Sequence, residues 1–116
     1  MLDAPCSGSG TLNENNVKYF SEELVNRSVK FQKELVDKAI KLLKKGGILV
    51  YSTCSILECE NEDIVRYILK SGVMELINID DFSDIPKLNT SINGCLCVCP
   101  SDLYEGFFVS KFRKIK

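Results

Sequence analysis

Histidine is absent from the 116 residues of this chain. Its absence excludes Ser-His-Asp and Cys-His catalysis, and it excludes every zinc site that needs an imidazole ligand. Long apolar runs are also missing, since the longest reach only about five residues where a bilayer span needs about 20. The first residues lack a basic stretch followed by an apolar one, so the sequence predicts no secretory signal and an intracellular protein. Chemistry must therefore come from Cys, Asp, Glu, Lys or Tyr, or from a bound cofactor.

Neither sign of charge dominates the sequence. Fifteen basic and 16 acidic side chains leave a net charge of −1, which excludes a chain-wide polycationic nucleic-acid binder but allows a local basic groove. An apolar fraction of 45% with 27% charged residues is typical of one globular domain. Without an export signal, the six cysteines are expected to be thiols used for packing, metal binding or catalysis rather than disulfides.

One amphipathic helix dominates the first half of the sequence. Apolar residues recur at three-to-four spacing over residues 22–45, and lysines occupy most of the opposite face. Gly46 and Gly47 follow, and a glycine in the left-handed conformation commonly ends a helix. Upstream, residues 1–5 are typical of the end of a strand, and residues 6–11 are typical of a tight loop of small residues. The pattern therefore predicts a strand, a loop and a long helix in that order.

Short apolar segments and a second helix follow. Residues 48–52 form an apolar run without alternation, as expected for a strand covered on both faces. A second amphipathic helix carries apolar residues between 64 and 69 behind a cluster of acids at 58–63, which favour a helix start. Further strands are predicted at residues 73–79, 95–99 and 106–114, with a polar loop at 80–93. This alternation predicts an α/β fold, namely the second half of a larger doubly wound sheet.

Two cysteines occupy equivalent places in this pattern. Cys6 follows the first predicted strand and Cys54 follows the second, each in a turn of small residues. A lone cysteine after a strand most often serves packing, but in a right-handed strand-helix-strand unit both strands end at one sheet edge, where ligands bind. If the two strands are neighbours, Asp3, Cys6 and Cys54 converge on one crevice. A thiol there becomes nucleophilic only as a thiolate.

Three ordered motifs carry a family resemblance. They are DAPCSGSGT at residues 3–11, GGILVYSTCS at 46–55 followed by ENE at 60–62, and GFFVSK at 106–111. Together they resemble the Sun-domain (nucleolar-protein, Fmu-type) RNA cytosine-5 methyltransferases, and the resemblance covers essentially the whole chain. It implies the C-terminal half of a Rossmann-like, S-adenosylmethionine-dependent methyltransferase sheet with flanking helices.

The resemblance also implies a reaction and roles for three residues. A methyl group is expected to pass from S-adenosylmethionine to carbon 5 of a cytosine in RNA, either ribosomal or transfer RNA. Cys54 matches the cysteine that adds to carbon 6 of the ring, which makes carbon 5 nucleophilic. Cys6 matches the cysteine that assists breakdown of the adduct. Asp3 matches the aspartate placed at the cofactor and the target base, where a carboxyl group stabilises developing charge.

The sequence departs from the family pattern at several points. The glycine-rich cofactor loop, the acidic ribose-binding residue and a catalytic lysine of the family all precede the DAPC motif, at which this chain begins. Residues 1–116 are therefore expected to form a partial catalytic domain without its cofactor-binding half, inactive alone, with an exposed first strand that invites self-association. Asn13, Glu14 and Cys97 stand where basic residues are common, which weakens phosphate contacts. Nucleus, nucleolus and cytoplasm all remain open as locations.

Two other functions compete with the methyltransferase. One is a non-catalytic RNA-binding or assembly module that retains the cysteines without turnover. The other is a redox or metal-binding thiol protein, supported only by Cys95, Cys97 and Cys99. These three alternate, so a strand would point them to one face, and packing is the simpler expectation because metal sites favour turn-like spacings such as Cys-x-x-Cys. The basic end at residues 111–116 is expected to be solvated rather than bound to RNA.

Overall fold

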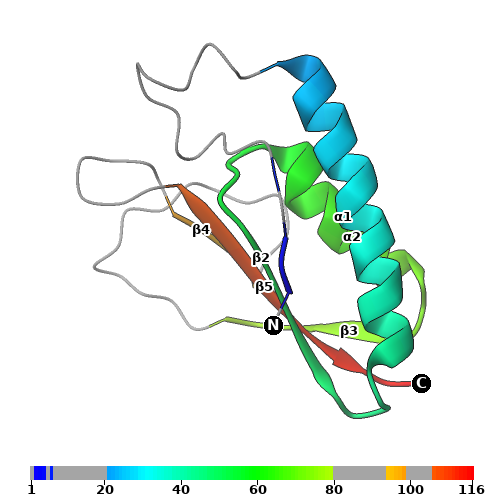
Figure 1. The fold of residues 1–116 in the computed structure, drawn as a ribbon. Helices are drawn as coiled ribbons and strands as arrows, with labels where there is room; N and C mark the ends of the chain where they lie inside the picture. Colours follow the sequence, from blue (N-terminus) through cyan, green and yellow to red (C-terminus); the bar gives the residue numbers. More distant parts are fainter. Residues whose placement is uncertain (1, 5, 7–20, 80–93, 99–105) are drawn as a thin grey trace.

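The fold is a mixed α/β arrangement in which two helices pack against a five-stranded sheet (Figure 1). The computed structural model describes residues 2–4, 6, 21–79, 94–98 and 106–116. In these residues the elements, in chain order, are β1 (Leu2–Asp3), α1 (Glu22–Leu42), β2 (Ile48–Thr53), the 3₁₀ turn η3 (Glu58–Glu60), α2 (Glu62–Lys70), β3 (Met74–Ile77), β4 (Leu96–Val98) and β5 (Phe107–Lys114). The predicted fold class and all five predicted strand segments are confirmed, whereas the polar loop predicted at 80–93 lies outside the described residues.

The sheet has the order β1-β2-β5-β3. β3 pairs with the last residues of β5, and β4 pairs with its first residues. β1 and β2 are parallel, with Leu2 opposite Tyr51 and Asp3 opposite Ser52. β5 runs antiparallel to both β2 and β3, so β3 has the same direction as β1 and β2. The helical crossovers therefore connect parallel strands, as the wound pattern predicted, and one reversed strand is inserted between the second and the third.

Helix α1 begins where the sequence predicted. Ser21 is its N-cap, and the Ser21 hydroxyl oxygen accepts a hydrogen bond from the backbone N–H of Leu24 at 3.1 Å. Two acids, Glu22 and Glu23, lie in the first turn, where the helix dipole favours negative charge. Neither α1 nor the other helices of the described residues are long and apolar enough to cross a membrane.

The predicted end of this helix at residue 45 is wrong, because α1 ends at Leu42. Leu43 has an extended backbone, and the ammonium group of Lys114 in β5 donates to the carbonyl oxygens of Ile40 and Leu43, both at 2.8 Å. A lysine distant in sequence thus satisfies helix carbonyls that would otherwise lack partners. Gly46, with φ of 85°, makes the predicted left-handed turn into β2.

A single apolar core lies between the helices and the sheet. Tyr51, Phe108 and Phe112 are its largest side chains from the strands, and all three are fully buried. Val36 of α1 and Ile64 of α2 belong to the same cluster, so both helices cover the same face of the sheet (Figure 1). The core therefore fixes β2 under the two helices.

Candidate active site

Asp3 and Ser52 mark the carboxyl ends of two neighbouring parallel strands. The backbone N–H of Ala4 donates to the carbonyl of Ser52 at 2.8 Å, which extends the pairing of β1 and β2 by one step. Cys6 follows β1 shortly after this point, and Cys54 is the first residue after β2. The condition for Asp3, Cys6 and Cys54 to share one sheet edge, that their strands are parallel neighbours, is thus met.

Asp3 presents an exposed carboxylate at this edge. One of its oxygens, Oδ1, accepts a hydrogen bond from the hydroxyl of Ser52 at 3.1 Å, so the carboxylate is held against β2. The Asp3 side chain remains accessible to solvent. A positioned and accessible carboxylate can accept hydrogen bonds from donor groups of a ligand.

The cysteines near the edge are partly buried, and a fully buried tyrosine lies close to Cys54 in the sequence. Cys6 and Cys54 are both half-buried, and each of the described cysteines is a thiol rather than half of a disulfide. Tyr51 of β2 is fully buried, and its hydroxyl donates to the backbone carbonyl of Glu60 at 2.8 Å. Burial raises the pKa of the Tyr51 phenol strongly, and the nearby Glu60 and Cys6 raise it further. Tyr51 therefore stays a neutral hydrogen-bond donor that links β2 to the turn after Cys54.

The residues on either side of Cys54 belong to a buried polar network. The hydroxyl of Thr53 donates to Oδ1 of Asn61 at 2.6 Å, and Nδ2 of Asn61 donates to the carbonyl of Ser55 at 2.7 Å. The backbone N–H of Ser55 donates to the hydroxyl oxygen of Thr53 at 3.1 Å. All three network residues are fully buried, so each of these bonds replaces water that cannot reach the groups. The turn at Cys54 is consequently fixed from both sides.

Glu60 forms the second half of this network. Its Oε1 accepts from the hydroxyl of Ser55 at 2.8 Å, and its Oε2 accepts from the side-chain amide of Gln32 in α1 at 3.1 Å. Gln32 and Glu60 are both fully buried. The network therefore connects α1, the end of β2 and the start of α2 around the candidate nucleophile.

Sequence reasoning missed this network. It assigned the acids at 58–63 only to the start of a helix and did not anticipate that the Glu60 side chain is fully buried. A signal was present: Gln32 and Ser28 lie one and two turns before Val36 on the buried side of α1, where a polar residue needs a partner. The spacing alone does not say which partner that is.

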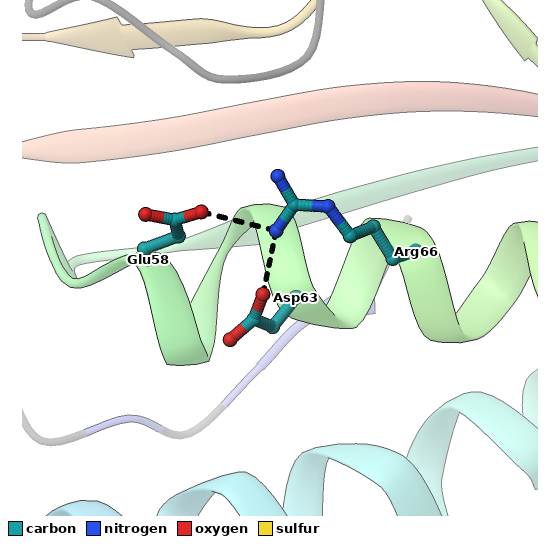
Figure 2. A network of polar contacts seen from close by, with 3 residues as sticks. All are labelled: Glu58, Asp63 and Arg66. Atoms are coloured by element: carbon teal, nitrogen blue, oxygen red, sulfur yellow. Dashed lines mark hydrogen bonds and ion pairs between the residues drawn. The ribbon is translucent and has the colours of Figure 1, made fainter.

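Two other acids of the cluster behave as predicted for a helix start. Figure 2 shows Glu58 and Asp63 binding the guanidinium of Arg66, at 3.0 Å and 2.6 Å. The three side chains are about half exposed, and such surface pairs contribute little to stability. This contact lies on the outside of α2 and is separate from the network that holds the Cys54 turn.

Cys95 and Cys97 confirm the prediction of packing for these cysteines. Cys97 belongs to the core cluster and Cys95 packs against it, whereas Cys99 lies outside the described residues. Within the ranges that the structure covers, no group of three or more Cys, Asp or Glu side chains is arranged to hold a metal ion.

The partial burial of Cys95 predicts a thiol of low reactivity. It raises the pKa of this thiol from an ordinary value of 9.0 to about 11, and Glu62 adds to the shift. Because the folded-state pKa is raised, the contribution of Cys95 to stability is complete below pH 9 and is lost as the pH rises through about 11. Alkylation of Cys95 by iodoacetamide should therefore be slow below pH 9, where the thiolate fraction is about 100-fold smaller than in the unfolded chain.

Peptide mass spectrometry over a pH series measures this alkylation. The same protein in urea is the control, since there Cys95 should react with the profile of an ordinary thiol. Equal pH profiles in the folded and the unfolded protein would contradict the burial of Cys95.

Comparison with known proteins relates this edge to a family. The family model described as 16S rRNA methyltransferase RsmB/F matches residues 1–113. Among curated proteins, ribosomal RNA small subunit methyltransferase F of Shewanella amazonensis is 38% identical over 121 residues, covering 97% of this chain and 25% of that protein. The protein of the same name from Vibrio vulnificus is 36% identical, covering 99% of this chain and 25% of that protein.

Solved structures show the same relationship. NSun6 from Pyrococcus horikoshii, in a crystal structure with SFG, is 33% identical with a TM-score of 0.85, covering 99% of this chain and 29% of that one. A methyltransferase homolog protein from the same organism is 32% identical with a TM-score of 0.71, covering 98% of this chain and 38% of that one. The chain spans about a quarter of the length of the curated relatives it matches. Because the family model covers nearly all of its residues, the chain belongs to the 16S rRNA methyltransferase RsmB/F family.

Proposed function

We propose that the natural polypeptide carrying this chain methylates carbon 5 of a cytosine in ribosomal RNA, with Cys54 as the nucleophile. The observation that carries the proposal is the position of Cys54 directly after β2, at the edge where the parallel neighbour β1 also ends. Family membership supports methyl transfer as the class of reaction, since curated relatives are named as small-subunit ribosomal RNA methyltransferases.

The chemistry requires a nucleophile because carbon 5 of cytosine is a weak one by itself. The Cys54 thiolate forms a bond from its sulfur to carbon 6, and the electron pair of the C5–C6 double bond then makes carbon 5 nucleophilic. When bound, S-adenosylmethionine supplies the electrophilic methyl group. Transfer of the proton from carbon 5 to a base, such as water, restores the double bond and expels the Cys54 thiolate, so the thiolate is regenerated. Cys6, at the same edge, assists this last step.

Asp3 is the residue of this chain that would hold the cofactor and the base. Its carboxylate is exposed and fixed by the Ser52 hydroxyl at 3.1 Å, so it can accept hydrogen bonds from amino groups without reorganising. A carboxylate at this edge fits the amino groups of S-adenosylmethionine, because its oxygens accept hydrogen bonds from N–H donors. Asp3 is proposed to supply one part of the cofactor site.

The named relatives also bear on the location of the protein and on the alternative function. The curated relatives named above are bacterial, which favours the cytoplasm and gives the nucleolar expectation no support. The non-catalytic RNA-binding module is not favoured, because the relatives are named as methyltransferases. We therefore propose S-adenosylmethionine as cofactor and ribosomal RNA as substrate.

Nucleoside analysis tests the reaction. The natural polypeptide, incubated with S-adenosylmethionine and a small-subunit ribosomal RNA transcript, should produce 5-methylcytidine detectable by mass spectrometry after digestion of the RNA. A transfer RNA transcript in parallel distinguishes the two substrate classes. Methyl groups found only on nitrogen or ribose oxygen, or no methylation of either RNA, would contradict the proposed function.

A further inference from the structure

We propose that Asn61 is a positioning residue for Cys54, which fixes the turn that presents the nucleophile. The importance of this turn for catalysis rests on the proposed function, in which Cys54 attacks the base. Asn61 itself touches neither thiol nor substrate in the proposal; it acts through the residues before and after Cys54.

The Asn61 side chain binds the residues before and after Cys54, and we call these two hydrogen bonds the clamp. The Asn61 carbonyl oxygen accepts from the hydroxyl of Thr53, and the Asn61 amide nitrogen donates to the carbonyl of Ser55, at 2.6 Å and 2.7 Å. Thr53 and Ser55 are the two chain neighbours of Cys54. One planar side chain therefore binds both chain neighbours of the nucleophile, and it uses the acceptor oxygen and the donor nitrogen of the amide to do so.

The position of Asn61 at the start of α2 is a second, independent observation that supports a positioning role. Asn61 is the N-cap of α2, where an asparagine side chain normally accepts a hydrogen bond from an N–H of the first turn. In the part of the chain that the structure describes, its side chain makes no such capping bond. Both of its polar atoms are engaged with the Cys54 turn instead, so the clamp replaces the usual stabilising role of this residue.

The clamp is itself supported by Glu60. The Glu60 carboxylate accepts from the Ser55 hydroxyl and from the Gln32 amide, and all of these groups are fully buried. A buried polar network of this kind is rigid when its bonds are made. The turn is consequently held by fixed contacts from α1 and α2 rather than by its own flexible backbone.

The substitution Asn61→Asp separates positioning from folding. Aspartate keeps the acceptor toward Thr53 and is a good N-cap residue, but it cannot donate to the Ser55 carbonyl when ionised. The rate of covalent adduct formation with RNA containing 5-azacytidine should fall about 100-fold, because a displacement of a reacting group by about 1 Å has effects of this size. The rate of alkylation of Cys54 by iodoacetamide should rise, since a loosened turn exposes this half-buried thiol.

Asn26→Asp is the matched control. Asn26 is exposed on α1, so the same chemical change is made away from the turn. Wild-type rates of both reactions are expected for this variant. A merely structural role of Asn61 would lower the melting temperature without opposite changes in the two rates, and that result would overturn the proposal.

A second pair of variants keeps the test decisive if Asn61→Asp fails to fold. Thr53→Val removes the hydroxyl that binds Asn61 at nearly constant volume, whereas Thr53→Ser retains it. Slower adduct formation with faster Cys54 alkylation is expected for valine, with serine closer to wild type. Equal rates for the two variants would overturn the proposal. If the wild-type protein forms no adduct at all, the proposed function fails, and the alkylation rates still decide whether Asn61 fixes the turn.

Discussion

Replacement of Cys54 by alanine is expected to abolish the covalent adduct with RNA containing 5-azacytidine. Methylation of natural RNA should fall by about a thousandfold or more, because removal of a nucleophile eliminates the covalent route. The measurement is a denaturing gel of the natural polypeptide incubated with S-adenosylmethionine and labelled RNA, in which the adduct migrates as a shifted band. The reason lies in the fold: Cys54 follows β2 at the edge shared with β1.

Two other cysteine variants give this experiment its controls. Cys6→Ala should retain the band and release product slowly, because Cys6 is proposed to assist the breakdown of the adduct. Cys59→Ala should behave as wild type, since Cys59 lies in η3 and has no proposed role. Loss of the band in Cys6→Ala but not in Cys54→Ala would reverse the assignment of the two thiols.

Replacement of Phe112 by alanine is expected to lower the free energy of unfolding by about 3–5 kcal/mol. Phe112 is fully buried in β5, between Leu49 of β2 and Leu76 of β3. The substitution therefore leaves a cavity where the reversed strand joins its two neighbours. Since a domain is typically stable by only about 5–15 kcal/mol, this loss would remove a large part of the total.

Phe31 offers the matched control for this measurement. It lies on α1 with 47% of its surface exposed, and Phe31→Ala should cost no more than about 1 kcal/mol. Urea unfolding followed by circular dichroism compares the two variants with the wild-type protein. Equal destabilisation by the two substitutions would contradict the placement of β5 at the centre of the core.

Local patterns predicted the elements of this fold well. Helix α1 begins at Glu22, as the apolar spacing indicated. Its end at Leu42 was not predictable, because the carbonyls there are satisfied by Lys114, which is distant in sequence. The insertion of β5 between β2 and β3 was equally inaccessible, since strand pairing depends on contacts between segments far apart in the chain.

The candidate site, too, was only partly predictable from the sequence. The parallel pairing of the two strands that end at Asp3 and just before Cys54 was predictable from the strand-helix-strand pattern, whereas the roles of Asp3, Cys6 and Cys54 stay predictions. The network beneath Cys54 was not predictable, because its members come from three elements. Gln32 and Glu60, for example, are 28 residues apart in sequence and meet only in the folded chain. A polar residue on an apolar helix face signals that a partner exists without naming it.

Identification of the cysteine bonded to RNA tests the central claim most directly. After reaction of the wild-type polypeptide with RNA containing 5-azacytidine, trypsin should release Cys54 in the peptide of residues 46–66, which also holds Cys59. Fragmentation of this peptide is expected to place the nucleotide on Cys54. A nucleotide found instead on Cys59, or on Cys6 in the peptide ending at Lys18, would show that Cys54 is not the nucleophile.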